Sequence, residues 1–501
     1  MILRELLAEV ESRQVRGPLD REVTGLALDS RRVQQGHAFF ALPGVNADGA
    51  RFAAAAVAAG AVAVIGPAGL TVEGVTQVEV DEPRLALAQA AARFHGHPSR
   101  NMDVIAVTGT NGKTTTTYLC ESILEAVGAR VGVIGTTGIR IAGETLPSAF
   151  TTPEAPELQA LLARMRDAQV RAVALEASSH ALVQRRTYGL DCDVCVFTNL
   201  TQDHLDYHGT MDAYRDAKLM LFDGRNGGGQ RATAVVNADD PSASHVLAAA
   251  VRGGQHVRVY GSRTAVGARD GVALARIDPQ PNGLALVFAE SAGGLVTEHA
   301  CALPMLGRFN AWNAAAAFAA ARALGVSAAD AVRGLEQSRG VPGRLERVVA
   351  GQLYEVVVDY AHTPDALERA LAACREHTHG RVLVVFGCGG DRDRGKRPIM
   401  GAIAARLADR AWVTNDNPRS EDPAAIAADI VAGAPDRGLE VVLDRRAAIA
   451  AAIAAARADD LVLIAGKGHE TTQTVGTQVL PFDDRAVARE LLAGRTGAGA
   501  M

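Results

Sequence analysis

The sequence predicts an α/β protein with three domains. Short apolar runs rich in Val, Leu and Ile alternate with Ala- and Leu-rich stretches of helical spacing along most of the chain. Continuous apolar strands that alternate with helices indicate parallel sheets covered on both faces. The 501 residues correspond to about three domains of roughly 150 residues each. The Pro-containing segment 97–100 and the Gly/Pro break at 340–343 place these domains at 1–97, 98–340 and 341–501.

We expect a small N-terminal α/β domain, a central domain with a P-loop-type parallel sheet, and a Rossmann-like C-terminal α/β domain. The uncharged run Phe52–Leu70 contains Gly60 and the pair Gly66-Pro67, which favours a buried helix and a strand at Ala61–Ile65 over a membrane span. Residues 252–298 are Gly-rich, which predicts an antiparallel excursion with strands at Val257–Tyr260 and Leu284–Phe288. The other predicted strands are Val104–Val107, Ala172–Leu175, Val194–Phe197, Ala234–Val236, Tyr354–Val358, Val382–Phe386 and Leu461–Ile464. The other predicted helices are Thr114–Ala126, Asn313–Leu324, Pro364–Cys374 and Ile399–Ala408.

Composition excludes several classes of protein and partner. Lys and Arg number 51 and Asp and Glu 56, so the chain as a whole attracts neither nucleic acid nor an anionic membrane. A hydrophobic content of 48% excludes wholesale disorder. The N-terminus has no pattern of an export signal, and six cysteines are too few for a disulfide framework. We therefore expect a cytoplasmic protein in which Cys192 and Cys195 are buried, and we take a monomer as the expected state.

The strongest functional signal is the segment Val104–Thr117, with the sequence VIAVTGTNGKTTTT. A predicted strand ends at Val107, a Gly-containing turn follows, and Lys113 and Thr114 open a helix. The amides of such a turn and the N-terminus of the helix can hold a polyphosphate. Lys113 would neutralise the β- and γ-phosphates, and the Thr114 hydroxyl would bind Mg²⁺. The spacing Gly-x-x-Gly-Lys-Thr is two residues shorter than the usual P-loop, yet its context predicts ATP binding.

Other side chains of the central domain could join this site. Glu176 ends a predicted buried strand, where α/β sheets place ligands, and could hold the same Mg²⁺; the alternative is a surface salt bridge. His204 and His208 have a spacing that could hold zinc on a helix, but no third ligand is close in sequence. His208 alone is more typical of a helix cap or a surface. Lys218 lies in a half-apolar helical stretch and has the pattern of a surface lysine.

These motifs resemble those of one enzyme family. Thr108–Thr115 is similar to the ATP loop of the Mur ligases and the folylpolyglutamate synthetases, which join an amino group to a carboxylate at the expense of ATP. The long segment before this loop argues against the synthetases. Further blocks match the family in order: Glu176–His180, Thr198–His204, Gly307–Asn313, Pro342–Glu346 and Asp359–Pro364. Three C-terminal blocks resemble the Mur ligases that add 2,6-diaminopimelate to UDP-N-acetylmuramoyl-L-alanyl-D-glutamate: Gly389–Pro398, Asp416–Arg419 and Gly466–Glu470.

The resemblance implies an ADP-forming ligase of peptidoglycan precursor synthesis that works through an acyl phosphate. It implies that Lys113, Lys218, His204 and Glu176 are catalytic, and that Mg²⁺ is held by Thr114, Glu176, His204 and Lys218. Lys218 would carry CO₂ as a carbamate, which requires a neutral amine and therefore a pKa lowered by burial or by positive charge. The implied nucleotide contacts are Gly109, Thr110, Asn111, Gly112, Lys113, Thr114, Thr115, Asn310, Arg344 and Asp359.

The resemblance also implies where the two other substrates bind. The UDP-linked muramoyl dipeptide would contact Leu28, Ser30, Val45, Asn46, Ala47, Thr151, Thr152, Ser178, Gln184 and Arg186. Phe150 stands where many relatives have Asn, so no contact is assigned to it. The amino acid, meso-diaminopimelate, would contact Arg392, Asp416, Asn417, Pro418, Arg419, Gly466 and Glu470. Diaminopimelate differs from lysine by a distal carboxylate, which the planar guanidinium of Arg419 can bind. A lysine-adding ligase and a non-catalytic nucleotide-binding module are the alternatives.

Overall fold

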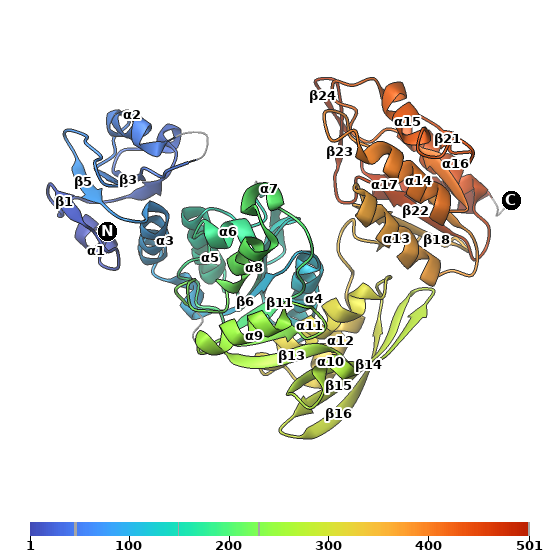
Figure 1. Ribbon diagram of the computed structural model, residues 1–501, viewed down its shortest axis with the longest axis horizontal. Coiled ribbons are helices and arrows are strands. Elements are labelled where there is room, and N and C mark those ends of the chain that lie inside the picture. Colours follow the sequence, from blue (N-terminus) through green and yellow to red (C-terminus); the bar gives the residue numbers. More distant parts are fainter. Residues whose placement is uncertain (45–47, 149, 229–230, 499–501) are drawn as a thin grey trace. The chain divides into compact units, whose positions relative to one another are not determined.

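The computed structural model describes residues 1–44, 48–148, 150–228 and 231–498. It confirms the α/β class and the predicted strands and helices of the motif-bearing segments (Figure 1). The chain divides into two compact units. The first unit comprises Met1–Ala273, Ala289–Thr297 and Ala315–Gly334, and the second comprises Leu274–Phe288, Glu298–Ala314 and Leu335–Met501.

The N-terminal sheet has five strands in the order β1-β5-β4-β3-β2, all parallel to their neighbours except β1. The prediction for Phe52–Leu70 is half right. The strand β4 is fully buried, but the helix α2 is only six residues long and buries only Ala53 and Ala56, so it is a surface helix. The strands are β1 (Gln14–Arg16), β2 (Gly25–Ala27), β3 (His37–Phe40), β4 (Ala63–Gly66) and β5 (Thr76–Glu79). The helices are α1 (Leu3–Leu6), α2 (Ala53–Ala58) and α3 (Pro83–Phe94).

The central sheet has eleven strands in the order β16-β15-β14-β13-β12-β11-β6-β10-β7-β8-β9. Its middle, from β13 to β7, is parallel, whereas β8 and β9 are antiparallel additions. The strands are β6 (Asp103–Thr108), β7 (Val131–Gly135), β8 (Gly138–Ile141), β9 (Glu144–Leu146), β10 (Ala172–Glu176), β11 (Val194–Phe197), β12 (Thr233–Asn237), β13 (His256–Ser262), β14 (Gly271–Gln280), β15 (Gly283–Ala292) and β16 (Leu295–Leu303). The helices are α4 (Lys113–Ala126), α5 (Ala155–Asp167), α6 (Ser179–Val183), α7 (Leu205–His208), α8 (Met211–Leu219), α9 (Ala243–Arg252), α10 (Arg263–Val266), α11 (Phe309–Ala323) and α12 (Ala328–Glu336).

The predicted antiparallel excursion begins later than expected. Val257–Tyr260 lies in β13, which pairs in parallel with β12 and therefore belongs to the main sheet. The excursion consists of β14, β15 and β16, which are joined by two-residue turns. Gly293 and Gly294 form the second of these turns with φ of +57° and +83°, the left-handed pair that tight hairpins require. The predicted strand Val257–Tyr260 is confirmed within β13, and only its place in the antiparallel excursion is wrong, because a short apolar run does not show whether its neighbour in the sheet is parallel or antiparallel.

The C-terminal sheet has the order β17-β18-β22-β19-β20-β21, and its strands from β18 to β21 are parallel. One core cluster packs α13, α14 and α15 on one face, and another packs α16 and α17 on the opposite face, as a doubly wound Rossmann-like domain requires. The strands are β17 (Glu346–Arg347), β18 (Glu355–Asp359), β19 (Val382–Phe386), β20 (Arg410–Val413), β21 (Glu440–Val441) and β22 (Leu461–Ala465), with a hairpin of β23 (Thr472–Val475) and β24 (Gln478–Pro481). The helices are α13 (Pro364–Glu376), α14 (Lys396–Leu407), α15 (Pro423–Val431), α16 (Arg445–Ala455) and α17 (Asp484–Ala498).

Two further expectations concern cysteines and membranes. All six cysteines are buried free thiols, and Cys192 and Cys195 lie in the core of the central domain, as predicted. Within the described ranges, every helix is too short or too polar to cross a bilayer.

Candidate active site

The phosphate loop has the predicted strand–turn–helix geometry. β6 ends at Thr108, and α4 begins at Lys113. Gly109 has φ of +148°, and a Cβ atom there would overlap the Thr198 hydroxyl, so only glycine fits this position. Gly112 has φ of +86° and precedes the first turn of α4. The loop is therefore a glycine-dependent turn that leads directly into a helix N-terminus.

The loop is fastened to the segment that follows β11. The Thr198 hydroxyl donates to the Asn111 carbonyl at 2.6 Å, and the amides of Thr110 and Asn111 donate to Asn199 at 2.8 and 2.9 Å. The amides of Thr110 and Asn111 therefore already donate within the protein and are not free for a phosphate. Only part of the turn can offer N–H groups to a phosphate, whereas the sequence predicted that the whole turn would. The first-turn amides of a helix have no intrahelical acceptor. The amides that α4 presents, including those of Thr114 and Thr115, are the ones that suit an anion.

Glu176 lies at the same edge of the sheet as the loop. It is the last residue of β10, whose register pairs it with Val107 on β6. Its side chain is buried, with 1% of the residue exposed, and accepts hydrogen bonds from the Thr136 amide at 2.9 Å and the Thr136 hydroxyl at 3.2 Å. The alternative of a surface salt bridge is therefore wrong. A buried carboxylate fixed beside a phosphate loop is suited to a cation.

Lys218 is buried, and its interpretation as a surface lysine is wrong. Only 2% of the residue is exposed, and Nζ donates to the Gly109 carbonyl at 2.9 Å. Nζ of Lys113 donates to the same carbonyl at 2.9 Å and to that of Thr110 at 2.8 Å. Burial, and then the positive charge of Lys113, lower the pKa of Lys218 well below its ordinary value. The lowered pKa favours the neutral amine that a carbamate requires.

An imidazole and phenol cluster covers Lys218. The Tyr214 ring centre is 4.3 Å from Lys218 Nζ, and the Tyr214 hydroxyl lies 3.2 Å from that of Thr110. His204, with φ of +52°, is more exposed, and its ring centre is 6.0 Å from that of Tyr214 and 4.9 Å from that of His180. Tyr214 therefore lies between His204 and the phosphate loop: its ring faces His204, and its hydroxyl lies beside that of Thr110.

His208 is not an ordinary surface or capping residue. Nε2 lies 2.9 Å from the Ser179 hydroxyl, and its ring centre is 5.1 Å from that of Tyr214. Burial, with the neighbouring cations, lowers the pKa of His208 to about 4. Sequence reasoning missed His180, Tyr207 and Tyr214, although they lie within or beside the blocks that contain Glu176 and His204. No group of three His, Cys, Asp or Glu side chains among the described residues can hold a metal, so the spacing of His204 and His208 does not make a zinc site.

The residues expected to face the muramoyl dipeptide converge on Arg186. Its guanidinium donates to the Thr152 carbonyl at 2.9 Å and to the Gln184 side chain, and pairs with Glu154 at 3.1 Å. It also lies 4.6 Å from the ring centre of Phe150, which is 49% exposed. Arg186 is therefore held in place, and Glu154 partly neutralises its charge.

Other predicted contacts near this point have structural partners. The Thr152 hydroxyl is fully buried and donates to the Glu176 carbonyl at 2.6 Å. The Ser178 hydroxyl caps α6 by accepting from Ala181 N, and that of Thr151 lies 3.2 Å from the Thr136 hydroxyl.

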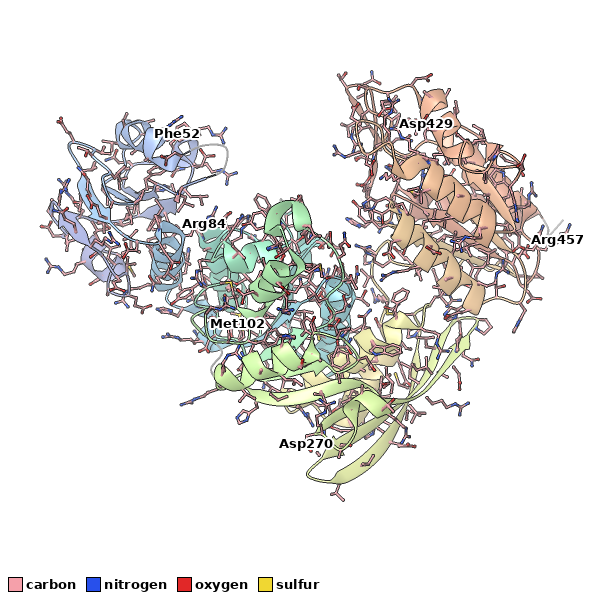
Figure 2. The ribbon with its side chains drawn as sticks, in the orientation of Figure 1. Phe52, Arg84, Met102, Asp270, Asp429 and Arg457 are labelled. Atoms are coloured by element: carbon pink, nitrogen blue, oxygen red, sulfur yellow. The ribbon has the colours of Figure 1, made fainter. Side chains whose placement is uncertain are left out.

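The N-terminal segment adds an ion pair to this part of the first unit. Arg84 of α3 pairs with Glu154 at 3.2 Å, and Figure 2 shows Arg84 in the side-chain view. Leu28 packs against the core of the first sheet, and Ser30 begins a 3₁₀ turn. The predicted contacts Val45, Asn46 and Ala47 lie outside the described residues.

In the second unit, Asp359 fixes the segment that carries Arg344. Asp359 ends β18, and its carboxylate accepts from the amides of Leu345 and Ala361 at 2.7 and 2.8 Å. Burial raises the pKa of Asp359, and the positive charge of Arg344 opposes this effect. The guanidinium of Arg344 lies 5.2 Å from the ring centre of Tyr360. Asn310 is buried and donates to the Leu306 carbonyl at 2.7 Å.

Two loops at one edge of the C-terminal sheet bring the predicted amino-acid contacts together. Asp416–Arg419 follows β20, and Gly466–Glu470 follows β22. The side-chain NH₂ group of Asn417 donates to the Glu470 carboxylate at 3.0 Å. Lys467 Nζ donates to the side-chain oxygen of Asn417 and to the Glu470 carboxylate, each at 3.2 Å. Asp416 is buried, and burial raises its pKa. Sequence reasoning missed Lys467, a fully buried lysine in the Gly-Lys-Gly-His-Glu block. Lys467 already binds one oxygen of Glu470, the carboxylate that was expected to bind an ammonium group of the substrate.

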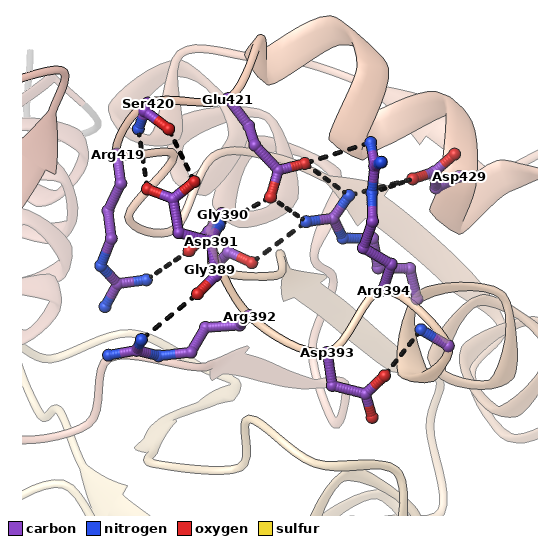
Figure 3. A network of polar contacts seen from close by, with 12 residues as sticks. Gly389, Gly390, Asp391, Arg392, Asp393, Arg394, Arg419, Ser420, Glu421 and Asp429 are labelled. Atoms are coloured by element: carbon purple, nitrogen blue, oxygen red, sulfur yellow. Dashed lines mark hydrogen bonds and ion pairs between the residues drawn. The ribbon is translucent and has the colours of Figure 1, made fainter.

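Arg419 and Arg392 differ from the other arginines at this edge. Arg419 Nη1 donates to the Gly390 carbonyl at 2.7 Å, and Arg392 Nη1 lies 3.3 Å from the Asp391 carbonyl (Figure 3). Arg419 has φ of +51°, and its backbone bonds to the β23–β24 hairpin at Thr474 and Gly476. Among the described residues, neither guanidinium forms an ion pair with a carboxylate. Both are available to an anionic ligand.

The fold and the phosphate loop define the class of protein. Three family models match successive segments: "Mur ligase family, catalytic domain" at residues 22–95, "Mur ligase middle domain" at 107–321 and "Mur ligase, glutamate ligase domain" at 343–468. The chain belongs to the Mur ligase family, whose members are ATP-dependent, ADP-forming ligases.

The curated relatives carry one more specific name. A protein of Syntrophomonas wolfei is 44% identical over 99% of this chain and 100% of its own length, and one of Caulobacter vibrioides is 45% identical over 95% and 96%. Both are named UDP-N-acetylmuramoyl-L-alanyl-D-glutamate–2,6-diaminopimelate ligase. A solved structure of that name is 34% identical, with a TM-score of 0.75 and 99% of both chains covered. A Mycobacterium tuberculosis folylpolyglutamate synthase, at 21% identity, a TM-score of 0.59 and coverage of 83% of this chain and 95% of its own, shares the fold.

Proposed function

We propose that the protein is an ATP-dependent ligase that adds meso-2,6-diaminopimelate to UDP-N-acetylmuramoyl-L-alanyl-D-glutamate in peptidoglycan precursor synthesis. The full-length relatives of that name support the two substrates. The observation that carries the choice of amino acid is the pair Arg392 and Arg419, which donate to carbonyls and have no carboxylate partner in the described part of the chain. A guanidinium binds a carboxylate through two parallel hydrogen bonds. The distal carboxylate of diaminopimelate, which lysine lacks, would complete this arrangement.

The residues at the phosphate loop fit ATP with Mg²⁺. Mg²⁺ commonly takes one or two protein carboxylates and completes its coordination with phosphate oxygens and water. The Thr114 hydroxyl and the buried Glu176 carboxylate supply such oxygen donors at the edge where α4 begins, and His204 would serve a second ion. When bound, Mg²⁺ would neutralise charge on the phosphates and on the attacking carboxylate. Asn310, Arg344 and Asp359 of the second unit are the further nucleotide contacts that we propose.

Lys218 fits the role of a carbamate better than that of a cation. Its Nζ is buried beside a second lysine on one carbonyl, an arrangement that disfavours two positive charges. Addition of CO₂ to the neutral amine would replace one of these charges by an anion and remove the repulsion. The carbamate would then be a further oxygen ligand beside the phosphate loop. Burial and the Tyr214 ring would hold it in place.

Two chemical steps follow from this arrangement. An oxygen of the dipeptide's carboxylate attacks the γ-phosphorus of ATP, the bond to ADP breaks, and an acyl phosphate forms. The amino group of diaminopimelate then attacks the carbonyl carbon, phosphate leaves with the bridging oxygen, and the nitrogen loses a proton. Lys113 and the N-terminus of α4 reduce the repulsion between the two anionic reactants. Arg186, held by Thr152, Gln184 and Glu154, would orient an anionic group of the dipeptide.

We also propose the domain limits 1–97, 98–340 and 341–501, because the three family matches fall within them. A cytoplasmic location and a monomeric state are part of the same proposal. Six buried free thiols agree with a reducing compartment.

The test is release of ADP in the presence of the UDP-linked dipeptide, with diaminopimelate or lysine as the amino acid. We expect diaminopimelate to be used and lysine to be used poorly. Arg419→Ala should raise the apparent KM for diaminopimelate without a comparable change in the KM for ATP. A wild-type preference for lysine would overturn the assignment of substrate, and an unchanged preference in Arg419→Ala would remove Arg419 from its role.

A further inference from the structure

The two turns that carry Arg392 and Arg419 are joined to each other at several points. The Gly390 amide donates to the Asn417 carbonyl at 2.9 Å, and the Asp391 amide donates to Glu421 at 2.6 Å. The Ser420 hydroxyl donates to the Asp391 carboxylate, also at 2.6 Å. Figure 3 shows the bonds of Asp391 to Ser420 and Glu421. The positions of the two guanidiniums therefore depend on how the turns are held together.

Three carboxylates lie on or beside these turns, and each has a hydrogen-bonding partner other than Arg392 or Arg419. Asp391 accepts from the hydroxyl and the amide of Ser420. Glu421 and Asp429 both pair with Arg397, at 2.8 and 2.9 Å. Figure 3 shows Glu421 and Asp429 on the side of the turn away from Arg392 and Arg419.

Arg397 is built into the fold rather than exposed on its surface. It lies in the first turn of α14, and its side chain has no exposed area. Its guanidinium binds both oxygens of Glu421, one oxygen of Asp429 and the Gly389 carbonyl, the last at 3.4 Å. One buried cation thus holds two acids and the start of the turn that carries Arg392. Arg394 adds a second, exposed contact to Glu421 at 3.3 Å.

We propose that Arg397 is a positioning residue for the selection of the amino acid. By binding Glu421 and Asp429, it keeps these acids from neutralising Arg392 and Arg419, and it holds the Gly389 turn in register with the Asp416–Arg419 loop. The two guanidiniums therefore stay unpaired with carboxylates of the protein and can bind a second carboxylate on the substrate. This inference rests on the proposed function, because only an amino acid with a distal carboxylate would need them.

The test compares Arg397→Met, Glu421→Gln and the double variant in kcat/KM for diaminopimelate and for lysine. In Arg397→Met, Glu421 loses its buried partner and keeps only Arg394 and the Asp391 amide, so its carboxylate can turn toward Arg392 or Arg419. We expect the apparent KM for diaminopimelate to rise about tenfold, with the KM for ATP within about twofold of wild type. The ratio of kcat/KM for diaminopimelate to that for lysine should fall. Glu421→Gln should restore part of the affinity in the Arg397→Met background, because the competing charge is gone.

The control is Arg381→Met, which removes another paired arginine of the same domain. Arg381 pairs with Asp460 and directly precedes β19, at the opposite end of that strand from Gly389. It should leave both the KM for diaminopimelate and the selectivity unchanged. If Arg397→Met does not fold, Arg397→Lys keeps the charge without the fork of donors and should raise the KM by a smaller factor.

The outcomes separate this inference from the proposed function. A wild-type enzyme that does not use diaminopimelate would contradict the proposed function. A wild-type enzyme that does use it, with Arg397→Met and Arg397→Lys unchanged in selectivity, would overturn only the role of Arg397. Equal losses with diaminopimelate and lysine, without recovery in the double variant, would show that Arg397 supports the fold alone and would also overturn the inference.

Discussion

Replacing Gly109 by Ala should disable the phosphate loop. Gly109 has φ of +148°, and an added Cβ would overlap the Thr198 hydroxyl. An L-residue in this region of backbone conformation costs about 1–3 kcal/mol. Displacing the Thr198 hydroxyl would break the hydrogen bond that its single proton donates to the Asn111 carbonyl at 2.6 Å, which contributes about 1 kcal/mol.

These losses together amount to about 2–4 kcal/mol, which corresponds to about thirtyfold or more in affinity at about 1.4 kcal/mol per factor of ten. We therefore expect the Kd for ATP of Gly109→Ala to rise by at least about thirtyfold, as measured by calorimetric titration. Gly128→Ala is the matched control, because Gly128 has φ of +78° at the end of α4 but no atom near its added Cβ. It should lower stability by about 1 kcal/mol and leave the affinity for ATP unchanged.

The double variant Gly109→Ala/Thr198→Ala tests the cause of the loss. Removing the Thr198 hydroxyl removes the closest overlap, and the next atoms, of the Asn199 backbone, are 3.0 and 3.1 Å away. The two changes should therefore be less than additive, so that the double variant binds ATP no worse than Gly109→Ala. An affinity of Gly109→Ala within threefold of wild type would refute the reasoning, as would strict additivity.

Three further predictions concern Lys218, His377 and Glu421. Lys218→Met should abolish amino-acid-dependent ADP release while the melting temperature stays near that of wild type; activity within tenfold of wild type would contradict the role of Lys218. His377 Nε2 accepts from the Gly307 amide at 2.7 Å, and burial lowers the pKa of His377. Because the folded protein binds this proton more weakly than the unfolded chain, stability should fall as the pH drops below about 6.5. His377→Gln should flatten that slope in urea titrations between pH 7.5 and pH 5.5, and an equally steep slope would count against this linkage. Hydrogen bonds from Arg397 lower the pKa of Glu421 from 4.5 to about 2, so their stabilisation is complete above about pH 4.5 and is lost as the pH falls toward 2. The difference in unfolding midpoint between wild type and Glu421→Gln should shrink between pH 5 and pH 3, and a constant difference would contradict the pairing.

The sequence was sufficient for the parts of the site that depend on local chemistry. The strand–turn–helix around Lys113 needs glycines at fixed positions, and Glu176 ends an apolar run of the length and composition typical of a buried strand. Both signals are contained within about ten consecutive residues. The structure confirms the strand, the turn and the helix, and it places Glu176 at the same edge of the sheet.

The parts that sequence reasoning missed depend on contacts between distant segments. The sequence around Lys218 has the pattern of an exposed helix position. In the structure its ammonium group is buried against the phosphate loop and donates to the Gly109 carbonyl, more than a hundred residues earlier in the chain. Lys467 is buried because Asn417 and Glu470 provide polar partners from two different loops. The interpretation of His208 as a helix cap or a surface residue missed its partners for the same reason, because Ser179 and Tyr214 come from α6 and α8. Spacing along one segment carries no information about such partners.

The central claim is that the phosphate loop transfers the terminal phosphoryl group of ATP to a carboxylate of the dipeptide. The most direct measurement uses UDP-linked dipeptide labelled with ¹⁸O in the reacting carboxylate, with mass spectrometry of the inorganic phosphate after turnover with diaminopimelate. An acyl phosphate predicts that each phosphate carries one ¹⁸O atom, because the bridging oxygen leaves with phosphorus. Unlabelled phosphate would show that water rather than the carboxylate attacked the γ-phosphorus, and would contradict the claim.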